Sequence, residues 1–154
     1  MFYAGVLSAG IVLVSLGSGS SPAYAEKKIA RESVPEQVST AFQKAYPQAV
    51  IRGYEQDEKN GQTVYEIESK EGSTRRDITY SGTGEVLEIE EAVKKSELPQ
   101  AGMEAIRTQF PKADIGRAEK IMRDGSVFYE VGLKQEKKHF SIELDAQGKI
   151  IKKH

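Results

Sequence analysis

The sequence contains no cysteine and no tryptophan, and it contains only two histidines among its 154 residues. Without cysteine the chain can form no disulfide, no thiol nucleophile and no thiolate metal site, so its stability has to come from buried apolar surface. Neither His139 nor His154 has a partner at metal-ligand spacing in the sequence. We therefore expect no metal site and no cofactor.

The chain also lacks an excess of charge and the short motifs of common enzymes. Its formal net charge is −1, which provides no basic surface for nucleic acid and no polybasic segment for a membrane. It contains no G-x-S-x-G, G-x-G-x-x-G or P-loop sequence. We therefore expect a protein that is not an enzyme, and that binds neither nucleic acid nor a membrane once its leader is removed.

Charged residues are missing from the first 25 positions, and this segment has the pattern of a secretory leader. An apolar or small run extends from Met1 to Leu16, and Ala23-Tyr24-Ala25 precedes the first charged residue, Glu26. This is the h-region and A-x-A cleavage pattern of a signal peptide, although no Lys or Arg precedes it. An uncleaved membrane anchor is the alternative, but the run is shorter than the ~20 residues of a spanning helix. We expect cleavage after residue 25 and a periplasmic or secreted protein.

The most informative feature that is present is an internal repeat. Residues 34–90 align without a gap to residues 98–154, at an offset of 64, with 12 identical residues among 57 pairs. The aligned pairs include the turn sequences Asn60-Gly61 and Asp124-Gly125, each followed by a β-branched or aromatic run. We therefore divide the chain into a leader (1–25), a lead-in (26–33), a first repeat (34–91), a linker (92–97) and a second repeat (98–154).

Each repeat has the pattern of one helix followed by four strands. In the first repeat Ser33 and Glu36 form a capping-box pattern, and apolar residues then recur at helical spacing until Pro47. The Asn-Gly and Asp-Gly sequences predict two-residue hairpin turns in which both residues have positive φ. The strands predicted in the first repeat are 49–57, 63–69, 75–80 and 86–90. The predicted fold class is α+β: two tandem units, each a helix and a four-stranded antiparallel sheet, with the helices on one face of the sheet.

The second repeat carries motifs of a known family. The run Val127-Phe128-Tyr129-Glu130-Val131 is followed by Phe140-Ser141-Ile142-Glu143-Leu144-Asp145-Ala146-Gln147-Gly148-Lys149-Ile150. This ending resembles the terminal hairpin of PepSY-like domains, in the group described as beta-lactamase-inhibitor-like. The first repeat departs from it at Ser81-Gly82-Thr83-Gly84, which has no Asp at the first turn position. The resemblance covers Ser33 to the end. It implies tandem helix-plus-four-strand units in an exported protein that binds proteins or inhibits a hydrolase of the peptidase or β-lactamase type.

Strand alternation predicts which residues share each face of the sheet. Ile78 and Ile142 occupy equivalent positions in the two repeats, and Ile67 lies on the same predicted face in the preceding strand of the first repeat. We expect these three apolar residues to pack beneath the helices. If the two halves join edge to edge, the opposite face forms a broad surface that a protein or peptide can contact. The candidate binding residues on that face are Tyr54, Glu66, Arg75, Asp77, Phe128, Glu130, His139 and Glu143.

Two interpretations of this polar face remain open. Tyr54 and Phe128 are either exposed anchors of an interface or ordinary strand residues among charges that pair across strands. Glu66 and Glu130 recur at equivalent positions, which favours structural cross-strand pairing over acid–base chemistry. The alternative to protein binding is an envelope sensor of a small ligand or an ion.

An acidic cluster at the end of the first repeat bears on the ion alternative. Glu88, Glu90 and Glu91 lie close together in the sequence. Carboxylates of this kind can hold Ca²⁺ weakly. We prefer the interpretation that they form the solvated end of a strand.

Overall fold

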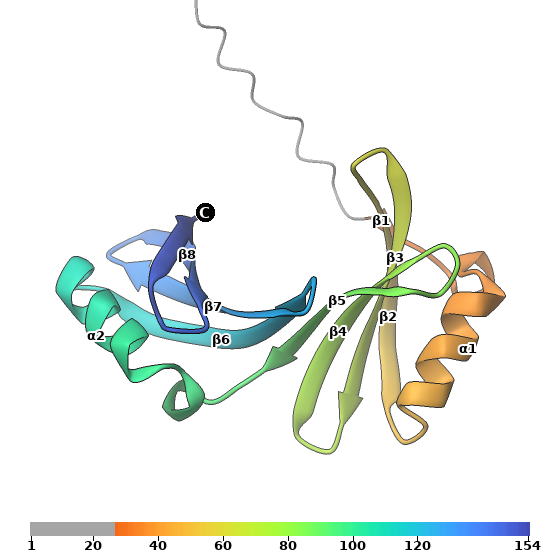
Figure 1. The fold of residues 1–154 in the computed structure, drawn as a ribbon, viewed down its shortest axis with the longest axis horizontal. Coiled ribbons are helices and arrows are strands. Elements are labelled where there is room, and N and C mark those ends of the chain that lie inside the picture. Colours follow the sequence, from red (N-terminus) through yellow and green to blue (C-terminus); the bar gives the residue numbers. More distant parts are fainter. Residues whose placement is uncertain (1–26) are drawn as a thin grey trace, which may run out of the picture.

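The computed structural model describes residues 27–154, and the predicted leader lies outside the described residues. One antiparallel sheet of nine strands, in chain order from β1 to β9, runs through these residues (Figure 1). A helix precedes four of the strands in each repeat. The elements are β1 (Lys27–Lys28), η1 (Arg31–Ser33), α1 (Glu36–Ala45), β2 (Val50–Lys59), β3 (Gln62–Glu71), β4 (Thr74–Ser81), β5 (Val86–Ala92), η2 (Lys95–Glu97), α2 (Gln100–Gln109), β6 (Asp114–Arg123), β7 (Ser126–Gln135), β8 (Lys138–Asp145) and β9 (Ile150–Lys153).

The two repeats share one continuous sheet, which differs from the predicted pair of four-stranded units. β5 pairs antiparallel with β6 from Glu88, opposite Arg123, to Ala92, opposite Glu119. The prediction ended β5 at residue 90, and it left the lead-in without the short strand β1, which pairs with β2. An unpaired edge of β5 would expose backbone donors and acceptors, and β6 satisfies them.

The two hairpin turns that flank the repeated run are confirmed. Asn60 and Gly61 have φ of 55° and 76°, and Asp124 and Gly125 have φ of 51° and 71°. Both residues of each turn are therefore left-handed, as a type I′ connection requires. These turns fix the register of β2 with β3 and of β6 with β7.

The helices begin and end in the same way in both repeats. α1 follows Pro35 and α2 follows Pro99, and each prolyl residue is the N-cap, without a side-chain capping bond. The predicted capping box at Ser33 is therefore wrong, because Ser33 lies in the preceding 3-10 helix η1, where its side chain is not at the N-cap position. Within residues 27–154, no helix is long and apolar enough to cross a membrane.

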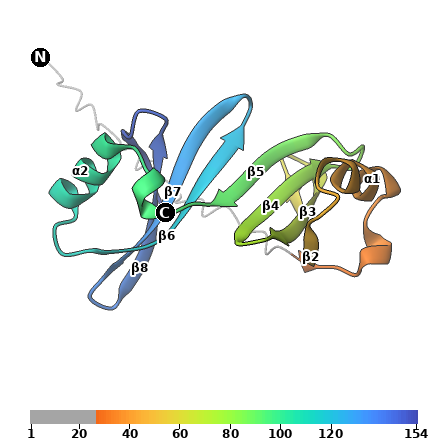
Figure 2. The same cartoon turned by 90° about the horizontal axis from the view of Figure 1, so that it is seen from below.

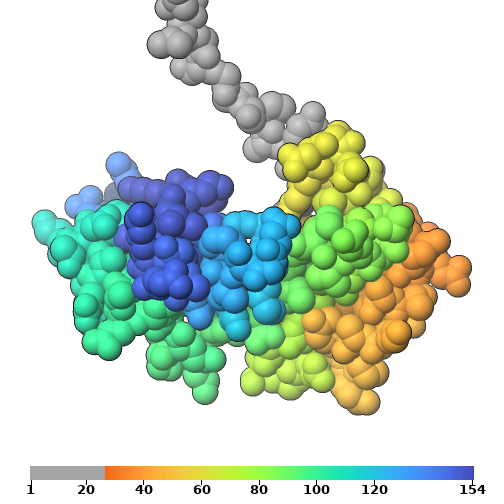
Figure 3. Space-filling view, in the orientation of Figure 1, coloured from red at the N-terminus to blue at the C-terminus, as the bar shows by residue number. Residues whose placement is uncertain are grey.

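Each helix covers its own apolar core, and both helices lie on the same face of the sheet. Ile78, in the core beneath α1, lies opposite Ile89, which in turn lies opposite Met122. Residues that are opposite each other in register point to the same side of a sheet. Ala118 shares that side with Met122 and belongs to the core beneath α2. Figure 2 shows the helices at opposite ends of the molecule, and Figure 3 shows the repeats as two lobes in contact along the middle.

Candidate binding face of the sheet

The face of the sheet opposite α1 and α2, which we call the open face, carries most of the predicted binding residues. Alternation along β3, β4, β7 and β8 places the neighbours of the core residues on this side. The residues that the structure places on the open face are Glu66, Arg75, Asp77, Phe128, Glu130, His139 and Glu143.

The predicted position of Tyr54 on the open face is wrong. Tyr54 lies opposite Ile67 and packs against the core beneath α1. The cause is a β-bulge between Ile51 and Gly53 in β2. A bulge adds one residue to a strand and reverses the alternation beyond it, so that Ile51 and Tyr54 both face the helix.

Glutamates lie directly opposite one another on the open face. Glu119 lies opposite Glu130, which lies opposite Glu143 on the next strand. The first repeat has the equivalent pair of Glu55 opposite Glu66. Glu119 and Glu143 are only 8% and 6% exposed. The symmetric positions of Glu66 and Glu130 are confirmed, and their neighbours across the strands are carboxylates, which repel when both are charged.

Two arginines of β6 offset this negative charge and join the repeats. Arg123 donates to Glu88 of β5 at 3.0 Å and to Glu143 of β8 at 3.1 Å. Its guanidinium carbon lies 4.8 Å from the centroid of the Phe128 ring, in a cation–π contact. Sequence reasoning missed Arg123, although a basic residue on a strand whose neighbours are acidic is a signal for such pairing.

The second arginine lies nearer the bulged end of β6. Arg117 donates to Asp77 of β4 at 3.4 Å and also pairs with Glu119 of its own strand. Sequence reasoning missed this residue too. Arg117 aligns with Gly53 in the first repeat, so the comparison of the two repeats did not indicate a charged residue at this position. The pairing with Asp77 reaches from one repeat to the other across β5.

The carboxylates near the junction of the repeats are held in an environment that disfavours charge. Burial first, and then the neighbouring carboxylates of Glu88 and Glu119, raises the pKa of Glu90 to about 7. Burial also raises the pKa of Asp77 and of Glu119, and Arg117 opposes both shifts. Burial is thus the largest reason why the carboxyl groups of Glu90, Asp77 and Glu119 bind protons more readily than exposed carboxyl groups do.

The acidic cluster at the end of the first repeat is neither a shared ion site nor a solvated strand end. Glu88 and Glu90 lie on the open face, and Glu88 is 8% exposed. Glu91 lies on the other face, where Arg76 donates to it at 2.7 Å. Among residues 27–154, no group of three His, Cys, Asp or Glu side chains is arranged to hold a metal ion.

Known proteins share this sequence pattern and fold. Residues 70–152 match the family described as "Putative beta-lactamase-inhibitor-like, PepSY-like", and residues 35–90 match the family described as "Peptidase propeptide and YPEB domain". No curated protein matches the chain.

Several solved structures from Bacteroides share the fold at low sequence identity. A protein of B. eggerthii described as "putative periplasmic" is 13% identical, with a TM-score of 0.68, covering 79% of this chain and 88% of its own. A DUF2874 family protein of B. uniformis is 14% identical, with a TM-score of 0.66, covering 78% and 88%. A BLIP-like protein of B. fragilis is 17% identical, with a TM-score of 0.60, covering 78% and 85%. With the sequence match over more than half of its length, the chain belongs to the beta-lactamase-inhibitor-like, PepSY-like family.

Proposed function

We propose that this protein is an exported, non-catalytic binding protein that holds a protein or peptide on the open face of its sheet. The observation that carries the proposal is the position of both helices on one side of a sheet that spans both repeats. The other side is left without a covering layer within residues 27–154. A large sheet face of mixed charge without a covering layer is available to a partner.

Phe128 is the anchor that this face offers. Its ring is partly exposed on β7, with Arg123 stacked over it and Glu143 bonded to Arg123. Aromatic and arginine side chains, ringed by polar groups, supply most of the binding energy in protein interfaces. Arg123 is already oriented by its two carboxylate partners, so that little side-chain entropy is lost on binding.

The family and the fold neighbours support the sharper form of the proposal. The family name and the description of the B. fragilis structure both refer to β-lactamase inhibitors. We extend this to an inhibitor of a hydrolase of the peptidase or β-lactamase type. The signal-peptide pattern of the first 25 residues and the periplasmic description of the B. eggerthii protein support export to the envelope.

The experiment is affinity capture from an envelope fraction with the immobilised protein, comparing wild type with Phe128→Ala. Loss of the ring removes the anchor, and we expect the captured partner to be lost while circular dichroism stays unchanged. Val86→Ala is the matched control. Val86 is 46% exposed and lies opposite Tyr80, on the helix side of the sheet. Capture that survives Phe128→Ala, or that disappears equally with Val86→Ala, would show that the open face is not the binding surface.

Recognition of a small ligand is the second candidate function, and one observation favours it. The open face is hollowed at the outer end of the second repeat by a cavity of about 640 Å³. Pockets for small molecules have volumes of about 300–1,000 Å³. The ion-sensing form of this alternative lacks such support, because Glu88 and Glu91 point to opposite faces.

A further inference from the structure

The outer edge of β9 is one of the two edges of the sheet. β9 is the final strand in the order β1 to β9, and among residues 27–154 it pairs with β8 alone. At the other edge of the sheet the lead-in covers part of β2, because β1 pairs with it and Ile29 donates its amide to Tyr54 at 3.0 Å. Within the described residues, the outer edge of β9 is therefore open to a further strand.

The first repeat shows what the equivalent edge pairs with. β9 pairs with β8 in the same register in which β5 pairs with β4. The aligned residues of the two strands are Val86 with Ile150, Glu88 with Lys152, and Ile89 with Lys153. The outer edge of β5 is paired antiparallel with β6 from Glu88 to Ala92. The fold therefore accepts a strand at this edge in one repeat and leaves the equivalent edge open in the other.

The backbone of β9 is oriented to pair with such a strand. His154 donates its amide to Ser141 of β8 at 2.9 Å, so the backbone groups of His154 point toward β8. Successive residues of an antiparallel strand direct their backbone groups to opposite edges, so those of Lys153 point away from β8. In β5 the aligned residue, Ile89, lies opposite Met122 of β6. Lys153 therefore offers its backbone N–H and C=O groups where β6 lies in the first repeat.

The charge of the edge determines which kind of strand fits. In the first repeat Glu88 of β5 lies opposite Arg123 of β6, and the two form an ion pair at 3.0 Å. Lys152 occupies the aligned position with the opposite charge, and Lys153 follows it. Both lysines are exposed, and neither forms an ion pair with a residue that the structure describes. A strand with carboxylates would gain here the pairing that Arg123 gives to Glu88.

The same lysines disfavour pairing with a second copy of this chain. Two β9 strands in antiparallel pairing would bring the lysines of both copies together. A copy of β2, which aligns with β6, would place Lys59 opposite Lys152. Lysine on an edge strand is a common protection against such self-association. It leaves the edge available to an acidic strand of a different protein.

We propose that the outer edge of β9 pairs antiparallel with an acidic, extended segment of a partner protein. The backbone of Lys153 bonds to the segment, and Lys152 pairs with a carboxylate that lies opposite it. Main-chain hydrogen bonds supply the affinity of such a contact, and side chains supply its specificity. The proposal goes beyond the binding function of the open face, because the edge is a separate surface.

The test is NMR titration of the isotope-labelled protein with synthetic peptides. The acidic probe is acetyl-Val-Glu-Val-Glu-Val-Glu-amide, and the basic control has lysine in place of each glutamate. We expect the acidic peptide to bind with a Kd of about 1 mM or tighter, to shift amide resonances of β8 and β9 most, and to bind at least about tenfold more tightly than the basic peptide. Absence of binding, equal binding of the two peptides, or shifts confined to other strands would overturn the proposal.

Two methylated forms of the acidic peptide separate strand pairing from simple attraction between charges. One form is N-methylated on its valines and the other on its glutamates. A glutamate opposite Lys152 points its own amide away from β9, whereas a valine opposite Lys153 points its amide toward β9. The valine-methylated form should therefore lose binding at least about tenfold, and the glutamate-methylated form should keep it. Equal binding of both forms would show that no strand is added.

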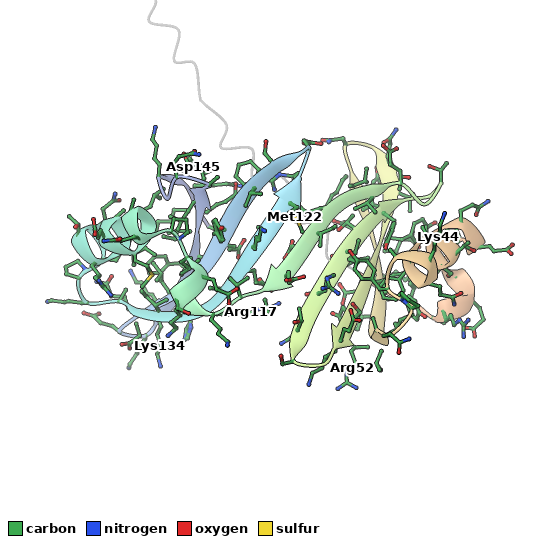
Figure 4. The ribbon with its side chains drawn as sticks, turned by 60° about the horizontal axis from the view of Figure 1, so that its bottom comes forward. Lys44, Arg52, Arg117, Met122, Lys134 and Asp145 are labelled. Atoms are coloured by element: carbon green, nitrogen blue, oxygen red, sulfur yellow. The ribbon has the colours of Figure 1, made fainter. Side chains whose placement is uncertain are left out.

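Variants of Lys152 test the specificity of the edge. Lys152→Glu copies the charge of Glu88 and should reverse the preference, so that the basic peptide binds more tightly. Because Glu143 lies opposite Lys152 on β8, Lys152→Gln is a milder second variant, and it should weaken the acidic peptide at least about threefold. Lys44→Gln is the matched control on exposed α1, and Figure 4 shows Lys44 in the other repeat from Asp145, the last residue of β8.

Two results with these variants would contradict the assignment. They are an unchanged preference for the acidic peptide in folded Lys152→Glu, and equal affinities of Lys152→Gln and Lys44→Gln for that peptide. The peptides replace the unidentified partner, so these results are independent of capture through Phe128 on the open face.

Discussion

The side chain of Glu90 lies in β5 among the carboxylates of both repeats. Register places it opposite Asp77 on one side and Ile121 on the other. Burial and the surrounding carboxylates raise its pKa from 4.5 to about 7. The folded protein therefore binds a proton at Glu90 more tightly than the unfolded chain does. The stabilisation of the folded protein that comes from protonation of Glu90 is fully present below about pH 4.5, and it is lost as the pH rises through about 7.

Glu90→Gln should stabilise the protein at about pH 8 and have little effect at about pH 4. Glutamine keeps the size of the side chain and removes the charge that becomes unfavourable above pH 7. The gain at high pH should be about 1–3 kcal/mol, at the lower end because Glu90 is partly exposed to solvent screening. Melting temperatures at the two pH values measure it. The same change at exposed Glu104 on α2 should be neutral at both, and a gain at Glu90 that does not depend on pH would contradict this explanation.

At the scale of elements, the last turn of each repeat packs closely against the first residues of its helix. Gly148, between β8 and β9, has φ of 86°, and a Cβ there would lie 2.4 Å from the backbone nitrogen of Gly102 in α2. Gly84 in the first repeat has φ of 84°, and its Cβ would lie 2.7 Å from the backbone oxygen of Gln37 in α1. Real side chains cannot occupy such space without moving backbone. Both glycines set the distance between helix and sheet.

Gly148→Ala should cost about 2–4 kcal/mol, because it adds a backbone clash to the strain of a left-handed residue. Urea unfolding measures the loss. Gly125→Ala is the control, because Gly125 also has positive φ, at 71°, but a Cβ there meets nothing within 4 Å. Its cost should be limited to conformational strain, about 1 kcal/mol. Equal losses in the two variants would show that turn strain alone matters, and that the contact between turn and helix does not.

The sequence predicts those parts of the fold whose cause is local. The turn at Asp124-Gly125 and the helix stop before Pro47 follow from residues within a few positions, and the structure has both. The face of Tyr54 follows from the bulge near Gly53, and the pairing of β5 with β6 follows from an open strand edge. Neither the bulge nor the pairing of these two strands can be recognised from the spacing of apolar residues in the sequence. Most of the open face was therefore predictable, but not the bulge that turns Tyr54 to the helix.

At the scale of the whole molecule, two cores share one sheet. The core residues beneath α1 and those beneath α2 form separate clusters, and none of the residues that the structure describes belongs to both. The repeats are joined by the β5–β6 ladder and by ion pairs such as Arg123 with Glu88. This arrangement allows one repeat to loosen while the other keeps its packing.

Ile142→Ala tests the separation of the cores. Ile142 is fully buried beneath α2, and its truncation should cost about 2–5 kcal/mol. Hydrogen exchange should accelerate in β7 and β8 more than in β3 and β4, because the lost contacts lie in the second core. Ile78→Ala, at the equivalent position in the first core, should show the opposite pattern. Equal acceleration in both repeats would indicate one cooperative unit, and an unchanged unfolding midpoint would contradict the packing itself.

The binding role of the open face is tested most directly by the Kd of the captured partner for two charge-reversed variants. Glu130→Lys changes a carboxylate in the middle of the open face, and Glu104→Lys makes the same change on exposed α2. We predict that Glu130→Lys weakens binding at least about tenfold, about 1.4 kcal/mol, while Glu104→Lys stays within about twofold of wild type. Equal Kd values for the two variants would show that the partner does not bind the open face.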